Sequence, residues 1–390
     1  MLQKKYGAKF LQIASNTYQW AITEGLAKNK ADFSILSYPF LPCYPLGFNS
    51  LMTPSMEFEF DGKKIGIADT YCSLLGLKSH SIKNRIQKYV QNWVEENNLS
   101  EEPFAVMTYT PCSDFVASLA PLKKRYKKMI ICTIVTDLID EFFNPIYKRS
   151  LLKRIQGRRE FKSVHSNYKF IDKFILLSKS MEEKIPEAVG RNIVVEGVHL
   201  GECMAPVHKT DVKKSLLYTG ALATHSCVND LVDAFMLTKN PDFQLIICGG
   251  GTLKDYVEEK SQEDSRIAYK GMVPRDEAIR LQKEATAVIN PRKPTVSLTK
   301  YSFPSKTMEY LASGTPMIGY RLQGIPDEYY DYLFTVENLD NESLANTIDK
   351  VLSAPDNVLY DKSLQAIEFI EKYKNSEYQV KRILDFLEAK

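Results

Sequence analysis

The chain has 390 residues, which is longer than one hydrophobic core usually serves, so we expect two domains. Its 44% hydrophobic, 25% charged and 11% aromatic content excludes a disordered chain, and the longest apolar run, Met129–Val135, is too short to span a membrane. Seven cysteines lie scattered without a CxxC pair, and five histidines are equally dispersed. This pattern excludes a disulfide scaffold and predicts reduced thiols and no metal site.

The net charge of +3 conceals a difference between the two halves of the chain. Residues 1–200 carry 28 Lys and Arg against 20 Asp and Glu, whereas residues 201–390 carry 23 against 28. Much of the basic excess lies at residues 123–128 and 147–159, interleaved with Leu, Ile and Tyr. We expect a cytoplasmic protein that contacts the anionic inner face of the cell membrane, or an anionic acceptor, through residues 123–159. A solvated helix face is the alternative, and no nucleic-acid partner is expected.

In the first half of the chain, short apolar runs alternate with helical patterns. Buried parallel strands are predicted by the runs Phe33–Ser37, Phe104–Thr108, Met129–Val135 and Phe174–Leu177. Helices are predicted at residues 16–28 and 81–97, where apolar residues recur at helical spacing. Residues 56–67 instead predict a hairpin that turns at Asp61-Gly62, a candidate insertion facing the acceptor.

The same alternation restarts after a polar stretch at residues 202–214. Further strands are expected at residues 215–218, 244–247, 268–269, 286–289 and 316–319. Helices are expected at residues 228–237, 253–260, 274–283 and 305–313, and a final amphipathic helix at residues 378–389. Strands separated by helices predict an α/β protein of two doubly wound domains facing a central cleft. We expect the domains at residues 1–198 and 199–369, with a C-terminal helix at residues 370–390 packing back on the first.

Glycines follow several predicted strands of the second half, at Gly220, Gly249–Gly251 and Gly271. A glycine at a strand end permits close approach of the backbone to an anion. Strand-to-helix turns also use glycine for purely structural reasons, and this remains the alternative for each of them.

The most informative segment is Tyr301–Pro316, which follows the basic sequence Asn290-Pro-Arg-Lys-Pro294. A helix that begins near Pro304 or Ser305 directs free amides and its positive end toward a diphosphate. Lys306 lies in the first turn of this helix and Glu309 one turn further along, within reach of ribose hydroxyls. Gly314-Thr-Pro316 then ends the helix and starts the next strand.

This segment resembles the signature of glycosyltransferase family 4, in which two glutamates flank seven residues ahead of an A-x-G-x-P close. Other family motifs follow in order at residues 16–20, 24–26, 135–138, 176–178, 196–198 and 218–222. The likeness is greatest to the branch that builds bacterial surface and capsular polysaccharides. It implies the GT-B fold of two Rossmann-like domains, retention of anomeric configuration, and neither metal nor cofactor. It also implies a nucleotide diphosphate sugar as donor, by default a UDP-hexose, and a saccharide acceptor that is lipid-linked.

The resemblance assigns a donor-binding set by position: Gly220, Met272, Val273, Tyr301, Ser302, Phe303 and Glu309. Glu309 would hold the donor ribose. The backbone amides of Ser302 and Phe303 would bind the diphosphate, and Met272 and Val273 would frame the base.

The same resemblance gives three residues catalytic roles. Arg292 and Lys306 would stabilise the negative charge that develops on the leaving diphosphate. Asp137 follows a first-domain strand near the place of the transferred sugar, where it would act as a general base. A helix cap is the alternative role for Asp137.

Three features depart from the family pattern. Tyr301 stands in place of the first glutamate of the signature. Ala221 and His225 stand where an Arg and a Lys usually reach the diphosphate, and the candidate replacements are Arg292, Lys293 and Lys306. Residues 9–13 would have to form the strand ahead of the first helix, unless the N-terminus is truncated.

These departures leave a second function open, a catalytically inactive GT-B protein that binds a sugar nucleotide or supports a partner transferase. A sugar-nucleotide epimerase or a phosphorylase is disfavoured, because neither the acid–base pair of the first nor the cofactor lysine of the second is evident. A dinucleotide-binding oxidoreductase is disfavoured because no GxGxxG motif follows a strand.

Overall fold

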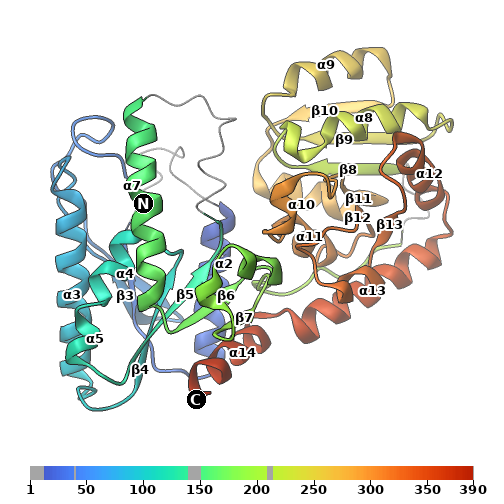
Figure 1. Ribbon diagram of the computed structural model, residues 1–390. Helices are drawn as coiled ribbons and strands as arrows, with labels where there is room; N and C mark the ends of the chain where they lie inside the picture. The colour runs from blue at the N-terminus through green and yellow to red at the C-terminus, as the bar shows by residue number, and fades with distance from the viewer. Residues whose placement is uncertain (1–12, 39–40, 139–150, 209–213, 390) are drawn as a thin grey trace. The chain divides into compact units, whose positions relative to one another are not determined.

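The computed structural model describes residues 13–38, 41–138, 151–208 and 214–389, and the chain divides into two compact units (Figure 1). Unit 1 comprises Met1–Leu176, Met181–Val194 and Val380–Lys390. Unit 2 comprises Leu177–Ser180 and Val195–Gln379. Each unit is described by itself.

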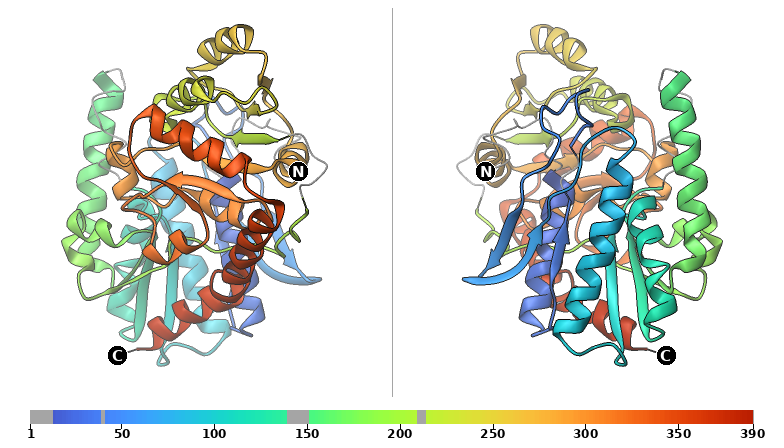
Figure 2. Two further views of the ribbon diagram at one scale, coloured as in Figure 1. Left: turned by 90° about the vertical axis from the view of Figure 1, so that its right-hand side faces the viewer. Right: turned by 90° about the vertical axis from the view of Figure 1, so that its left-hand side faces the viewer.

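Unit 1 contains a parallel sheet in the order β4–β5–β6–β7. Its strands are β4 (Phe104–Tyr109), β5 (Met129–Val135), β6 (Lys173–Leu176) and β7 (Asn192–Val194). Its helices are α2 (Ile13–Lys28), α3 (Lys78–Glu96), α4 (Ser113–Leu119), α5 (Leu122–Arg125), α7 (Leu151–Asn167) and α14 (Ser376–Glu388), of which α14 begins in unit 2. Helices α3, α4 and α7 pack in a row beside the sheet (Figure 2). The Lys173 side chain joins β6 to α14 by donating to the carbonyls of Phe386 and Leu387, at 2.5 and 3.2 Å.

The predicted hairpin is present as a second, smaller sheet of unit 1. It has the order β1 (Ile35–Ser37), β3 (Lys63–Ala68), β2 (Met56–Phe60), with β2 and β3 antiparallel. Asp61 and Gly62 form the turn, with φ values of 48° and 73°. Positive φ at both central positions is the geometry of a two-residue type I′ turn, which explains why Asp-Gly occupies it.

The described basic residues between 123 and 159 lie in two separate parts of unit 1, in and just after α5 and along α7. Lys123 and Arg125 lie in α5, just before β5, where Lys123 pairs with Asp172 and Arg125 with Glu95, the latter at 3.2 Å. Helix α7 connects two parallel strands and therefore runs against them, so its first residues lie at the opposite, carboxyl edge of the sheet (Figure 1). Residues 139–150 of the predicted stretch, like residues 9–12 of the predicted first strand, lie outside the described residues. Within the described ranges, no helix is both long and apolar enough to cross a bilayer.

Unit 2 is built on a six-stranded parallel sheet in the order β10–β9–β8–β11–β12–β13. The strands are β8 (Ser215–Thr219), β9 (Gln244–Cys248), β10 (Ile267–Gly271), β11 (Ala287–Asn290), β12 (Met317–Tyr320) and β13 (Phe334–Val336). The helices are α8 (Val228–Leu237), α9 (Lys254–Glu263), α10 (Arg275–Glu284), α11 (Ser305–Leu311), α12 (Asn341–Leu352) and α13 (Asp356–Tyr373). All five residues of β8 are buried, as expected for a central strand of a parallel sheet covered on both faces.

Short 3-10 helices complete both units, at Tyr168–Phe170, Lys179–Glu183, Pro186–Ala188, Thr224–Ser226, Ser297–Lys300 and Asp327–Asp331. The strands and helices predicted for the second half of the chain are present, with ends that differ by a few residues. Strands β7 and β13 and helices α4, α5, α7, α12 and α13 were not predicted.

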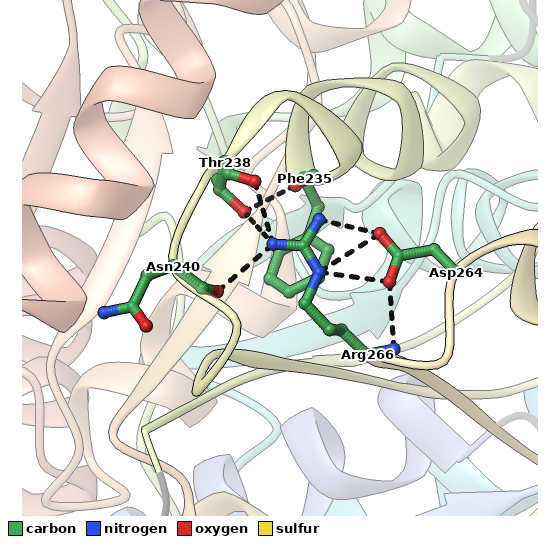
Figure 3. A network of polar contacts seen from close by, with 5 residues as sticks. All are labelled: Phe235, Thr238, Asn240, Asp264 and Arg266. Carbon is green, nitrogen blue, oxygen red and sulfur yellow. Dashed lines mark hydrogen bonds and ion pairs between the residues drawn. The ribbon is translucent and has the colours of Figure 1, made fainter.

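A polar network around Arg266 fixes the amino edge of the unit 2 sheet (Figure 3). The guanidinium donates to the Asp264 carboxylate at 2.7 Å and to the carbonyls of Thr238 and Asn240 at 2.8 and 3.2 Å. It also lies 5.1 Å from the centre of the Phe235 ring. Hydrogen bonding from Arg266 lowers the pKa of the Asp264 carboxyl. The loops after α8 and before β10 are thereby held together.

A buried ion pair joins the beginning of unit 2 to its end. Lys374 follows α13, and its ammonium group donates to Glu196 Oε1 at 2.6 Å, with side chains only 5% and 3% exposed. The Tyr329 hydroxyl donates to the same carboxylate oxygen at 2.7 Å. We refer to Glu196, Tyr329 and Lys374 as the terminal clamp. Alongside it, the backbone amide of His199 donates to the Lys374 carbonyl at 2.8 Å.

Candidate functional site

The candidate site of unit 2 lies where the strand order reverses, between β8 and β11. In open parallel sheets, ligands bind at the carboxyl ends of strands at such a switch point. Strand β8 ends there at Thr219, followed by Gly220, and β11 ends at Asn290, followed by Pro291 and Arg292.

Backbone packing brings the glycine loop after β9 against the loop after β8. The amides of Gly220 and Leu222 each donate a hydrogen bond of 3.0 Å, to the carbonyls of Cys248 and Gly250. Gly249 has φ 142°, and a Cβ atom there would lie 1.8 Å from the Gly220 carbonyl oxygen. Glycine is therefore required at Gly249 by both its conformation and its contact.

Arg292 is a half-buried cation at the switch point. Within the described part of the chain, its buried Nε atom has no hydrogen-bond partner and no carboxylate pairs with its guanidinium. Burial lowers the pKa of this group, opposed by the nearby Tyr218 and Cys227. Because an uncompensated buried charge is costly, the free protein carries at this point a cation that an anionic ligand would stabilise.

The two neighbouring basic candidates differ from Arg292. The Lys293 ammonium lies 2.6 Å from the Asp230 carboxylate of α8, so its charge is already compensated. Burial and the charge of Arg292 lower the pKa of His225 below its ordinary 6.5, which leaves the imidazole neutral at pH 7. Of Arg292, Lys293 and His225, Arg292 is therefore the best suited to neutralise a diphosphate.

Glu309 is held by two donors on the same oxygen. The Gln282 amide donates to Glu309 Oε1 at 2.6 Å, and the Lys306 ammonium donates to the same atom at 2.8 Å. Burial raises the pKa of the Glu309 carboxyl, but the charge and hydrogen bond of Lys306 and the hydrogen bond of Gln282 outweigh it, and the net pKa lies below 4.5. Glu309 is thus ionised at neutral pH, and its side chain is 38% exposed. A carboxylate oxygen is available there to accept hydrogen bonds from hydroxyl groups.

Helix α11, which carries Lys306 and Glu309, is fixed to the end of β8. The Tyr310 side chain is fully buried, and its hydroxyl accepts from the Thr219 amide at 3.0 Å. The Gln282 amide also contacts Thr219 Oγ1 at 3.3 Å. The α11 carboxylate and the Gly220 turn therefore belong to one hydrogen-bonded assembly.

The segment that precedes α11 is anchored by one buried ring. Phe303 is 8% exposed and packs against Tyr329, with ring centroids 5.3 Å apart. The Lys300 ammonium lies 5.5 Å from the Tyr301 ring, and the Ser302 carbonyl abuts Gly324, where a Cβ would be 2.0 Å away. The backbone at residues 301–304 is thus positioned by contacts on both sides of Ser302.

The two residues proposed to frame the base follow β10. Met272 is 82% exposed, and its sulfur would lie 3.2 Å from a Cβ at Gly250. Val273 is partly buried against the core of unit 2. An exposed methionine beside a glycine loop provides an apolar surface of the kind that a nucleobase could cover.

Asp137 belongs to unit 1, where it follows the carboxyl end of β5. Desolvation raises the pKa of its carboxyl, opposed by a hydrogen bond from Thr136. Tyr109, the last residue of the adjacent β4, lies near it and contacts Tyr18 of α2 at a ring distance of 5.9 Å. The alternative role of Asp137 as a helix cap concerns the residues after Leu138, which lie outside the described ranges. Among the residues with described positions, no cluster of three metal-ligating side chains is present.

Sequence comparison finds a family model that matches the region carrying this site. Residues 213–354 match the family model "Glycosyl transferases group 1". This range contains all of the unit 2 candidates. No curated protein matches the chain in sequence.

Structural comparison places both units in one known architecture. Sucrose-phosphate synthase from Thermosynechococcus elongatus matches with a TM-score of 0.61 and 15% identity over 95% of this chain and 92% of that chain. HepE of Anabaena in complex with UDP matches with a TM-score of 0.57 and 13% identity, over 80% and 83% of the two chains. The lipopolysaccharide outer core galactosyltransferase WaaB matches with a TM-score of 0.53 and 16% identity, over 78% and 79%. The chain has the GT-B fold, with two Rossmann-like domains.

Within this GT-B chain, some of the predicted site residues prove to be connected and others do not. Glu309 and Lys306 are directly bonded, and both connect through α11 and Thr219 to Gly220. Gln282 was not predicted, because its role depends on a contact with Glu309, which is 27 positions away in the sequence. The sequence gives little indication of this role, because Gln282 is one polar residue among many in α10. In the structure its side chain is 0% exposed.

Proposed function

We propose that this protein is a glycosyltransferase whose unit 2 binds a nucleotide diphosphate sugar at the β8–β11 switch point. The observation that carries the proposal is Arg292, a half-buried cation with no carboxylate partner among the described residues, placed after a strand at this point. The match of residues 213–354 to a glycosyltransferase model supports it independently.

In the proposed donor complex, each group has a distinct role. Arg292 binds the diphosphate, and Lys306 exchanges its contact with Glu309 for the developing negative charge as the sugar departs. Glu309 accepts hydrogen bonds from the ribose hydroxyls. The amides of Ser302 and Phe303 lie next to the start of α11, where they would complete the diphosphate site.

The remaining donor residues define the base and sugar ends of the site. Met272 and Val273 frame the base, and Gly220 allows close approach of the backbone. Tyr301, which stands where the family has a glutamate, contacts the donor sugar. We propose retention of configuration and a metal-independent reaction, with Asp137 of unit 1 as general base.

The proposed donor and acceptor follow from the structural neighbours and the family branch. HepE was solved with UDP, and WaaB is a galactosyltransferase of lipopolysaccharide. We propose a UDP-hexose donor and a lipid-linked saccharide acceptor in bacterial surface polysaccharide biosynthesis. The protein would work at the cytoplasmic face of the membrane, contacting anionic lipid through residues 123–159, whose described part includes α5 and α7.

A second candidate function is an inactive GT-B protein that binds a sugar nucleotide or supports a partner transferase. Ala221 and the neutral His225 favour it, because neither supplies the charge that the family pattern places after β8.

One experiment separates the two functions. The protein is incubated with UDP-, GDP- and ADP-sugars, with and without bacterial membrane lipid extract, and nucleotide release is measured. Release that requires the lipid extract, and that persists in EDTA, supports a metal-independent transferase with a lipid-linked acceptor. Nucleotide binding without release from any donor would leave only the inactive protein, and no binding would refute both the transferase and the inactive sugar-nucleotide-binding protein.

A further inference from the structure

We propose that Gln282 is the residue that positions Glu309 for ribose recognition, an inference that rests on the proposed donor site. Gln282 lies in α10, a helix that carries none of the predicted site residues. Its amide donates to Glu309 Oε1 at 2.6 Å and contacts Thr219 Oγ1 at 3.3 Å. One buried side chain thus joins α10, α11 and the end of β8.

Because Gln282 is buried, its side chain cannot exchange the contact with Glu309 for one with solvent. The residue is 0% exposed, and the Thr315 hydroxyl donates to its backbone carbonyl at 2.7 Å. Its amide orientation is dictated by chemistry, because an ionised carboxylate can only accept, so the NH₂ group must face Glu309. Lys306, by contrast, is 35% exposed and able to move toward a bound anion.

Only one end of the Gln282 side-chain amide forms hydrogen bonds with described residues. Its Oε1 atom is buried and has no hydrogen-bond partner among the described residues, while its Nε2 atom has two acceptors. A glutamine retained only for packing or for fold stability would be expected to satisfy both ends, because a buried unpaired oxygen is costly. Only the NH₂ group of Gln282 forms hydrogen bonds, and the shorter of the two is to Glu309, the residue proposed to bind the ribose.

The arrangement leaves Glu309 charged and directed. Both donors bind Oε1, so Oε2 is the oxygen left to accept from the ribose hydroxyls. A neutral amide fixes the carboxylate without cancelling its charge, which a second buried cation in the place of Gln282 would do. When Lys306 moves to the diphosphate, Gln282 remains as the contact that keeps Glu309 in place.

The test measures how Gln282→Met affects three ligands by titration calorimetry: UDP, 2′,3′-dideoxy-UDP and inorganic pyrophosphate. We expect UDP to bind about tenfold more weakly, because a charge-assisted hydrogen bond that orients the ribose ligand is lost. Affinity for dideoxy-UDP and pyrophosphate should stay within about twofold, since neither offers ribose hydroxyls to Glu309. The UDP affinity of the variant should also fall off at a higher pH than in the wild type, because the pKa of Glu309 rises without its donor.

Two further variants keep the outcome decisive. Gln379→Leu removes another fully buried glutamine of unit 2, one that donates to the Gly197 carbonyl at 3.1 Å, and should leave the ratio of UDP to dideoxy-UDP affinity unchanged. If Gln282→Met does not fold, Gln282→Asn keeps a buried amide but shortens its reach, and the same selective loss for UDP is expected.

Equal weakening of UDP and dideoxy-UDP, or no weakening of either, overturns the positioning role. If the wild type binds none of the nucleoside diphosphates UDP, GDP and ADP, it is the proposed donor site that fails. If GDP or ADP binds in place of UDP, the comparison is made with that nucleotide and its dideoxy form, and the same two outcomes decide.

Discussion

Replacing Arg292 by methionine should stabilise the free protein while it weakens donor binding. The Nε atom of Arg292 is buried and has no hydrogen-bond partner among the described residues, and a buried donor in that state costs about 1–3 kcal/mol. Because the guanidinium is only half-buried, we take the lower end, about 1 kcal/mol, as the gain when a flexible apolar side chain takes its place. For a unit of this size, that gain raises the melting temperature by about 2–4 °C.

The same substitution removes the proposed diphosphate contact. Charge-assisted hydrogen bonds contribute about 1.5–3 kcal/mol each, so the loss of one or two should weaken UDP binding by a factor of about 10 to 100 or more. Thermal unfolding without ligand and titration calorimetry with UDP measure the two effects on the same preparation.

The adjacent residue provides the control for Arg292→Met. Lys293 is 13% exposed and paired with Asp230 at 2.6 Å, so Lys293→Met leaves a partly buried carboxylate without its partner. It should destabilise the protein, by about 1–2 kcal/mol, with a smaller effect on UDP affinity. If Arg292→Met destabilises as Lys293→Met does and leaves UDP affinity unchanged, Arg292 is a structural cation and the reasoning is wrong.

Three further predictions concern single contacts. The wild type should bind UDP more tightly than Glu309→Gln does, and this difference should disappear only as pH falls below 4.5, because the lowered pKa of the Glu309 carboxyl keeps it charged down to that range. A difference that is already lost near pH 6 in calorimetric titrations would contradict the ribose role. Lys374→Met should lower the free energy of unfolding, measured in urea, by about 3 kcal/mol, because it leaves the buried Glu196 carboxylate without its cation. Adding Glu196→Gln should recover part of this loss, and strictly additive effects of the two changes would argue against the ion pair. Gly249→Ala should destabilise unit 2 by about 2 kcal/mol or more and abolish UDP binding, because the new Cβ would lie 1.8 Å from the Gly220 carbonyl oxygen, and a normal melting curve with normal binding would refute that contact.

Much of the fold was predictable because its signals are local. Strand β5 matches the predicted range Met129–Val135, and the Asp61-Gly62 turn carries its own conformational signal. Helix α12 had a readable start as well: the Asp340 side chain accepts from the Ser343 amide, and the apolar residues that follow recur at helical spacing. The sequence therefore carries a local signal for α12, although the helix was not predicted.

The candidate site was predictable only in its sequence-local parts. Lys306 and Glu309 are three residues apart on one helix, so their proximity follows from helical geometry. Arg292 and Lys293 look equivalent in the sequence, and only the fold shows that Lys293 has Asp230 while Arg292 has no such partner among the described residues. The contact between Gln282 and Glu309 is equally tertiary, because it depends on how α10 and α11 meet the same strand.

The terminal clamp has a consequence for how unit 2 could be handled as a module. Its main segment enters at Val195 and leaves at Gln379, and these two ends run side by side, paired at His199 and Asn375. A segment with adjoining ends can be excised, grafted into a related chain or circularly permuted without stretching its backbone. All three clamp residues lie inside the segment, so a donor-binding fragment cut at these ends would retain the ion pair and the hydrogen bond that join its two ends.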